Sequence, residues 1–147
     1  MSLIAWEKNG WLVAHQTSPQ EIQDLLGVAE RDLHDCATKG LSDDWRLAIA
    51  YNAALQCATA ALAASGYRAS REAHHFRVIH SLNFTLGVDS NQVGQLDGFR
   101  KKRNTCDYER AGAVSTAEAK EIAALAKTLL QQLKEWLRTK YPALLAK

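Results

Sequence analysis

The stretch SDDWRLAIAYNAALQCATAALAASG, residues 42–66, decides the fold of this chain. Ser42, Asp43 and Asp44 are residue types that cap and begin helices, and Ser65 followed by Gly66 is typical of a helix end. The spacing predicts that one helical face is formed by Trp45, Ala48, Ile49, Asn52, Leu55, Thr59 and Leu62. Because alanine is small, neighbouring helices can approach this segment closely, so we expect a helix with others packed against it.

The same stretch needs a test as a membrane span, because residues 47–67 carry no formal charge. About 20 apolar residues suffice to cross a bilayer. Alanine supplies little transfer energy, however, and Asn52 and Gln56 interrupt the run. The segment therefore predicts a core helix and no membrane partner. Glu7 interrupts the N-terminal region, which lacks the apolar run of a secretory signal, so we expect a cytoplasmic protein.

Helix signals continue on both sides of the stretch. Ser18-Pro19-Gln20-Glu21 predicts the start of a helix that ends by Gly40, and Ser115 with Glu118 predicts a capping box at the start of the last helix. Two further helices are expected over residues 70–86 and from Ser90 or Asn91 onward. No segment alternates with period two, and there is no internal repeat. The sequence predicts an all-α fold, an up-and-down bundle of four to five helices in one domain, residues 1–147.

Composition narrows the classes of function. The 147 residues are 47% hydrophobic with a net charge of +2, so any nucleic-acid contact must come from a local basic patch. Three cysteines form no CxxC pair, and the five histidines lack the i,i+3 or i,i+4 spacing of a helical metal site. We therefore expect no metal and no cofactor. His75 and His80 are expected to line a basic surface or to cap the core.

The candidate site is the stretch DGFRKKRNTCDYE, residues 97–109. Residues 100–103 are four consecutive cations, which cannot all face a core. On a helix, Arg103 pairs with Asp107 and Asn104 with Tyr108 at i,i+4. A guanidinium in this setting suits a phosphate because its planar fork binds two oxygens. The alternatives are a solvated helix face, or a structural Arg103–Asp107 pair with Tyr108 packed beside it.

A family resemblance accompanies this motif. It rests on residues 51–54 (YNAA), 65–68 (SGYR), 72–75 (EAHH), 99–104 (FRKKRN) and 107–108 (DY). In this order they resemble the HEPN superfamily of small prokaryotic α-helical domains, over about Pro19 to Tyr141. The resemblance implies a bundle that forms a homodimer, with the polar motifs of both subunits in a shared cleft.

The resemblance also implies what the cleft does. Nuclease members of the superfamily cut RNA without metal, using an Arg and a His four to six residues apart, often with a polar residue after the Arg. Arg103 and Asn104 match the first part, but the position of the histidine holds Tyr108, and the window closes at Arg110. Tyrosine, with an ordinary pKa near 10, is a poor general base at neutral pH.

Three hypotheses follow. The first is a HEPN-like domain of prokaryotic conflict or toxin–antitoxin type, non-catalytic or weakly catalytic, that binds RNA or a nucleotide in the dimer cleft. Its partner protein would be a nucleotidyltransferase-like antitoxin or another conflict-system protein. Its binding residues would be Arg100, Lys102, Arg103, Asn104, Asp107 and Tyr108. The second is a metal-independent endoribonuclease with Arg103, Asn104 and Tyr108 as catalytic residues, in which Tyr108 or a histidine from another helix replaces the missing one. The third is a structural protein-interaction module.

Overall fold

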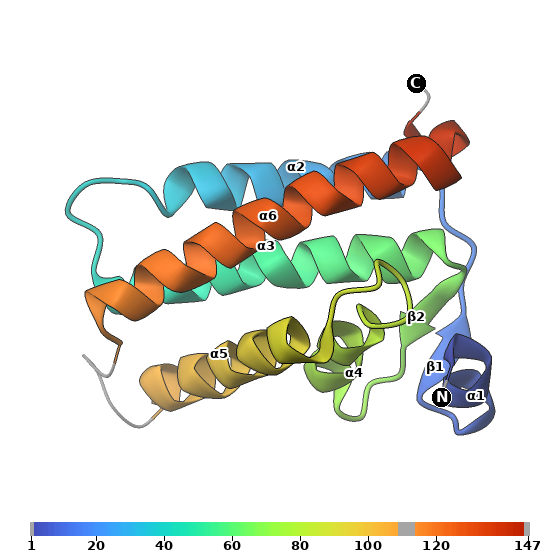
Figure 1. The fold of residues 1–147 in the computed structure, drawn as a ribbon, viewed down its shortest axis with the longest axis horizontal. Helices are drawn as coiled ribbons and strands as arrows, with labels where there is room; N and C mark the ends of the chain where they lie inside the picture. Colours follow the sequence, from blue (N-terminus) through green and yellow to red (C-terminus); the bar gives the residue numbers. More distant parts are fainter. Residues whose placement is uncertain (1, 109–113, 146–147) are drawn as a thin grey trace.

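The computed structural model describes residues 2–108 and 114–145, and for residues 105–108 it describes only the helical backbone. Figure 1 shows a mostly helical chain with one small sheet. The elements are α1 (Leu3–Lys8), β1 (Leu12–Ala14), α2 (Pro19–Asp35), α3 (Asp43–Ala64), β2 (Tyr67–Ala69), α4 (His74–Ser81), α5 (Ser90–Tyr108), α6 (Thr116–Lys140) and the 3-10 helix η1 (Pro142–Leu145). The predicted all-α class is confirmed.

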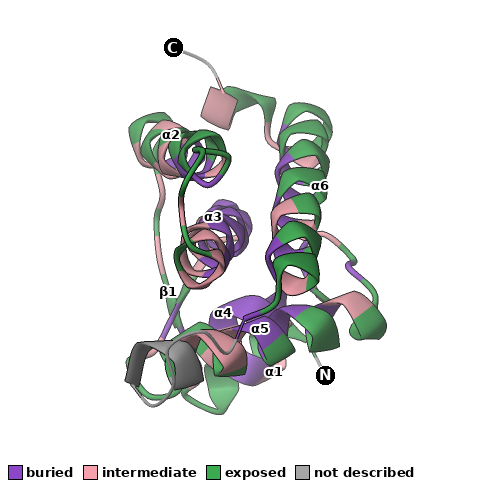
Figure 2. Ribbon diagram, turned by 90° about the vertical axis from the view of Figure 1, so that its left-hand side faces the viewer, coloured by how far each residue is buried: buried purple, intermediate pink, exposed green. Residues whose placement is uncertain are grey.

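α3 is the helix on which the others assemble. It packs against α2, α4, α5, α6 and β2, and lies between α2 and the α4–α5 pair (Figures 1 and 2). The Ser42 hydroxyl accepts a hydrogen bond from the backbone N–H of Trp45 at 3.2 Å, so the predicted start is confirmed. Its buried residues are mostly alanine, which lets four helices contact it at close range.

The predicted single core face of α3 was wrong. Trp45 is 63% exposed, and Asn52 and Thr59 are only half-buried. The buried side chains instead lie most of the way round the helix, from Leu47 to Ala64. Alanine is only weakly hydrophobic, so the alanines outside the predicted stripe gave no sign of burial in the sequence. They are buried because helices pack against α3 on several sides.

α3 is also the segment tested above as a membrane span. Residues Asp43–Ala64 are long and apolar enough to cross a bilayer, and 72% of the apolar window is buried inside the protein. Such burial is typical of the core helix of a globular protein.

α2 and α6 begin where the sequence predicts. The Ser18 hydroxyl accepts from the Glu21 N–H at 3.1 Å, and Ser115 and Glu118 form a complete capping box. α2 ends at Asp35, somewhat before Gly40, which adopts a left-handed conformation with φ of 83°. The apolar stripe of α6 is largely buried, at Ile122, Leu129, Leu133 and Leu137.

The N-terminal region and the predicted helix over residues 70–86 differ from expectation. α4 covers only His74–Ser81, and β2 precedes it. β2 pairs antiparallel with β1, with Leu12 opposite Ala69 and Ala14 opposite Tyr67. Three-residue strands are too short to give a period-two pattern, which explains why the sequence did not reveal them. Buried residues accordingly begin at Trp6 in α1, which was also not predicted.

Candidate functional site

The predicted site residues lie on α5, whose start near Ser90 is confirmed. Arg100, Lys102 and Arg103 are half-buried and Asn104 is exposed. Asp107 and Tyr108 belong to the helical backbone of α5, but their side chains lie outside the described residues. Their pairing with Arg103 and Asn104 therefore stays a prediction.

Arg100 is oriented by a buried carboxylate one turn earlier. Its Nε–H donates to Asp97 Oδ1 at 2.7 Å, and its side chain is 20% exposed. The guanidinium carbon also lies 5.7 Å from the ring centre of Phe76 on α4. These two contacts fix the direction in which Arg100 presents its remaining N–H groups.

Three basic side chains lie close to the Asp97 carboxylate. Lys101 Nζ lies 3.5 Å and His80 Nε2 3.8 Å from its Oδ2, in addition to the bond from Arg100. Burial alone would raise the pKa of the Asp97 carboxyl. The Arg100 hydrogen bond and the charges of Arg100, His80 and Lys101 outweigh it, so the pKa lies below its ordinary value and Asp97 is ionised at neutral pH.

Arg103 lies over the ring of a buried tyrosine from α3. Its guanidinium carbon is 5.7 Å from the ring centre of Tyr51, which is 1% exposed. Burial raises the pKa of Tyr51 to about 12, against the opposing effects of Arg100 and Arg103. Tyr51 is therefore a neutral phenol that packs beneath the Arg103 guanidinium.

His75, in the first turn of α4, completes this arrangement. Its ring centre is 6.3 Å from that of Tyr51. Partial burial, the neighbouring His74, and the charges of Arg103 and Arg100 lower the pKa of His75 below its ordinary value. At neutral pH His75 is thus an uncharged imidazole beside two guanidinium groups.

We call the four residues Tyr51, His75, Arg100 and Arg103 the arginine cluster. Sequence reasoning placed the two arginines but not Tyr51 or His75 at the site. Both come from other helices, and no spacing along the chain relates them to α5. The charge run alone offered no signal for the tyrosine beneath it.

Lys102 and Asn104 are placed differently from the two arginines. Lys102 Nζ lies 3.4 Å from Glu118 Oε2 at the start of α6. This ion pair connects α5 to α6 and directs Lys102 toward that helix. Asn104 is exposed on α5. Arg100 and Arg103 are thus both close enough to Tyr51 and His75 to influence their pKa values. Lys102 instead forms an ion pair that holds α5 against α6.

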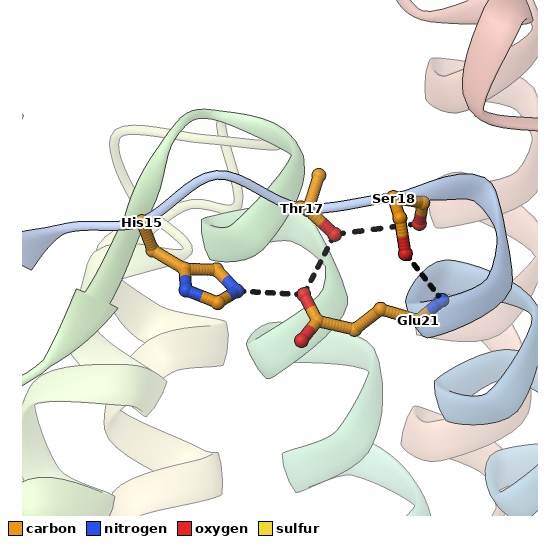
Figure 3. A network of polar contacts seen from close by, with 4 residues as sticks. All are labelled: His15, Thr17, Ser18 and Glu21. Atoms are coloured by element: carbon orange, nitrogen blue, oxygen red, sulfur yellow. Dashed lines mark hydrogen bonds and ion pairs between the residues drawn. The ribbon is translucent and has the colours of Figure 1, made fainter.

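A second polar network lies at the start of α2 (Figure 3). His15 Nε2–H donates to Glu21 Oε1 at 2.8 Å, and the Thr17 hydroxyl donates to the same oxygen at 2.6 Å. The Thr17 and His15 hydrogen bonds and the charge of His15 lower the pKa of Glu21, although burial opposes them. The network fixes the segment between β1 and α2, which is a structural role.

The chemistry of the arginine cluster is that of an anion site. Guanidinium groups bind phosphate or carboxylate oxygens through paired N–H donors. Within residues 2–104 and 114–145, no group of three His, Cys, Asp or Glu side chains is placed to hold a metal ion.

No protein-family model matches the chain, and a search of curated proteins found no significant match. The resemblance to the HEPN superfamily therefore rests on the residues quoted above.

Proposed function

We propose that the arginine cluster binds the phosphates of RNA or of a nucleotide. The observation that carries the proposal is that Arg103 and the uncharged His75 both lie beside the buried Tyr51, while Arg100, one turn earlier on α5, is close enough to influence the pKa of both rings. A guanidinium has five N–H donors. Asp97 accepts a hydrogen bond from the Nε–H of Arg100 and so orients the Arg100 guanidinium.

The surroundings of the cluster fit a polyanion. Lys101 and Asn104 are exposed on the same helix, and His75 is exposed on α4. A lysine such as Lys101 suits the phosphate backbone, while the amide of Asn104 suits a base or a ribose hydroxyl. The proposal also includes Asp107 and Tyr108 as binding residues, although their side chains lie outside the described residues.

We further propose that the chain is a HEPN-like domain. The helical fold and the position of Arg103-Asn104 on a long late helix support this assignment. The proposal includes an up-and-down bundle, a homodimer with the two α5 motifs in one cleft, and a cytoplasmic role of toxin–antitoxin or conflict type with a nucleotidyltransferase-like antitoxin partner.

A second candidate function is metal-independent RNA cleavage. It is favoured by His75, whose lowered pKa leaves one ring nitrogen unprotonated at neutral pH and able to accept a proton. His75 would take the proton of a ribose 2'-hydroxyl. The 2'-oxygen would then attack the adjacent phosphorus, giving a cyclic phosphate and releasing the 5'-oxygen, which takes a proton from water, while Arg103 stabilises the charge on the phosphoryl oxygens.

The test separates binding from cleavage. End-labelled RNA is incubated in excess EDTA with wild-type protein, Arg103→Ala, His75→Ala and the control Lys8→Ala, a change of an exposed residue on α1. We expect retention on a native gel by wild type and the control, and its loss in Arg103→Ala.

The denaturing gel decides the second candidate. RNA cleavage lost in both Arg103→Ala and His75→Ala establishes the nuclease. Retention without cleavage supports the binding module. If wild type neither retains nor cleaves RNA, and Arg103→Ala changes only subunit association or melting temperature, the cluster is a structural interaction module and the proposal is wrong.

A further inference from the structure

A second surface, between α2 and α6, has a different character from the arginine cluster. It is a groove of about 630 Å³, and none of its lining residues belongs to α4 or α5. Figure 2 shows α2 and α6 on either side of α3, with exposed residues along the outer side of both helices. Its inner wall includes Leu33, Cys36, Ala119, Ala123 and Leu130.

Positive charge follows one edge of the groove. Lys120, Lys127 and Lys134 all line it and recur every seven residues along α6. Residues seven apart on a helix lie on nearly the same face. At about 1.5 Å per residue, the three lysines extend over about 21 Å of the groove edge.

The acids of the groove have partners within the chain. Glu30 Oε1 lies 2.7 Å from Lys134 Nζ, and Asp43 Oδ2 accepts a hydrogen bond from the Thr116 hydroxyl at 2.8 Å. Lys120 and Lys127 are exposed and form no ion pair with any residue in the described part of the chain. Positive charge is therefore in excess along the open part of the groove.

We propose that this groove binds an acidic amphipathic helix of a partner protein. The elongated edge of lysines matches a helix of about four turns, since each turn rises about 5.4 Å. Acidic side chains seven residues apart on the partner would face Lys120 and Lys127. Its apolar stripe would cover the alanines and leucines of the inner wall, as in other complexes that seat a helix in a groove.

The test uses a fluorescein-labelled peptide of about 15 residues, matched to the groove at about 1.5 Å per residue. It carries leucines on one helical face and glutamates on the flanks, and its twin has lysines in place of the glutamates. Fluorescence anisotropy measures binding of both to wild type, Lys127→Glu and Lys8→Glu. The last variant makes the same change of net charge on α1.

We expect the acidic peptide alone to bind, with binding that weakens as salt rises. Lys127→Glu should weaken binding by about tenfold through like-charge repulsion, and Lys8→Glu should bind as wild type does. Ala123→Phe, which fills the groove without changing charge, should also weaken binding. Equal binding of both peptides, no binding to wild type, or equal loss in Lys8→Glu would overturn the proposal.

Two further outcomes identify another occupant and also overturn it. Sedimentation of the protein alone tests whether Lys127→Glu dissociates a dimer, which would make a second copy of this chain the occupant. Binding of laurate in the groove without binding of the peptide would make the occupant a small amphiphilic anion.

Discussion

α3 and α5 are helices of similar length, 22 and 19 residues, with opposite relations to the rest of the molecule. α3 is buried over most of its surface and contacts α2, α4, α5 and α6. α5 contributes apolar residues such as Leu96 and Phe99 to the core but also carries the run of cations from Arg100 to Arg103. Changes in α3 should therefore alter stability, and changes on the polar side of α5 should alter binding.

The two helices meet at Tyr51. This α3 residue is buried beneath Arg103 of α5, so the structural helix supplies the base of the proposed site. The run of cations on α5 therefore supplies only part of the proposed site. Its geometry depends on what the alanine-rich helix places below it.

The largest effect expected on stability comes from truncating a core leucine of α3. Leu62 is 1% exposed, and Leu62→Ala removes buried apolar volume and leaves a cavity. We expect a loss of about 2–5 kcal/mol in the free energy of unfolding. Asn104→Ala, an exposed change on α5, should stay within about 0.5 kcal/mol. If urea unfolding showed the same loss of free energy for Leu62→Ala and Asn104→Ala, the contrast between a structural α3 and a solvent-facing side of α5 would be wrong.

Enlarging an α3 alanine tests the close approach of the helices. Ala58 is fully buried, so Ala58→Leu should overpack the core and lower the free energy of unfolding by about 1–3 kcal/mol. Ala117→Leu makes the same change at an exposed position of α6 and should have an effect below about 0.5 kcal/mol. Chemical unfolding of the two variants measures the difference, and a neutral Ala58→Leu would show that the core has unfilled space.

A substitution of Asp97 tests the contact between its buried carboxylate and Arg100 on α5. Asp97→Asn keeps the size of the side chain but removes the charge that holds Arg100, and should lower the free energy of unfolding by about 1–3 kcal/mol at pH 7. Because the folded pKa is lowered, this stabilisation is complete above the unfolded pKa of about 3.9 and is lost as pH falls through the folded value. The gap between wild type and Asp97→Asn should therefore shrink below pH 4 in urea unfolding curves. A difference in the free energy of unfolding that does not change with pH would contradict the lowered pKa of Asp97.

The smallest effect expected is at a helix end. Ser115→Ala removes the hydroxyl that accepts from the Glu118 N–H at 3.0 Å, and should lower the free energy of unfolding by about 1 kcal/mol. Ser115→Asp restores a capping oxygen and should recover most of the loss. A variant with alanine that is as stable as wild type would show that α6 is held by its packing alone.

Much of the fold was predictable because local signals mark the helix ends. Ser18, Ser42 and Ser115 each cap a helix where the sequence indicates. The burial of α3 on several sides was not predictable from one helical stripe, since alanine fits both a core and a surface. The β1–β2 pairing joins Leu12 to Ala69, which lie far apart in the sequence, and three-residue strands leave no pattern.

The candidate site was predictable only in its α5 part. Arg100 and Arg103 stand in a charge run that any sequence analysis finds. Tyr51 and His75 join them through packing between helices, and neither has a spacing that indicates it. The lowered pKa of His75 follows from its partial burial and its charged neighbours, which only the folded chain brings together.

The most direct test of the central claim is the salt dependence of RNA affinity, measured by fluorescence anisotropy with wild type, Arg103→Ala and the control Lys8→Ala. If the arginine cluster binds phosphates, wild type and the control should show a steep fall of log K with log salt. The slope for Arg103→Ala should be shallower by about 0.7, the value expected for one lost phosphate contact on a single strand. An identical slope and affinity in Arg103→Ala and wild type would contradict the account.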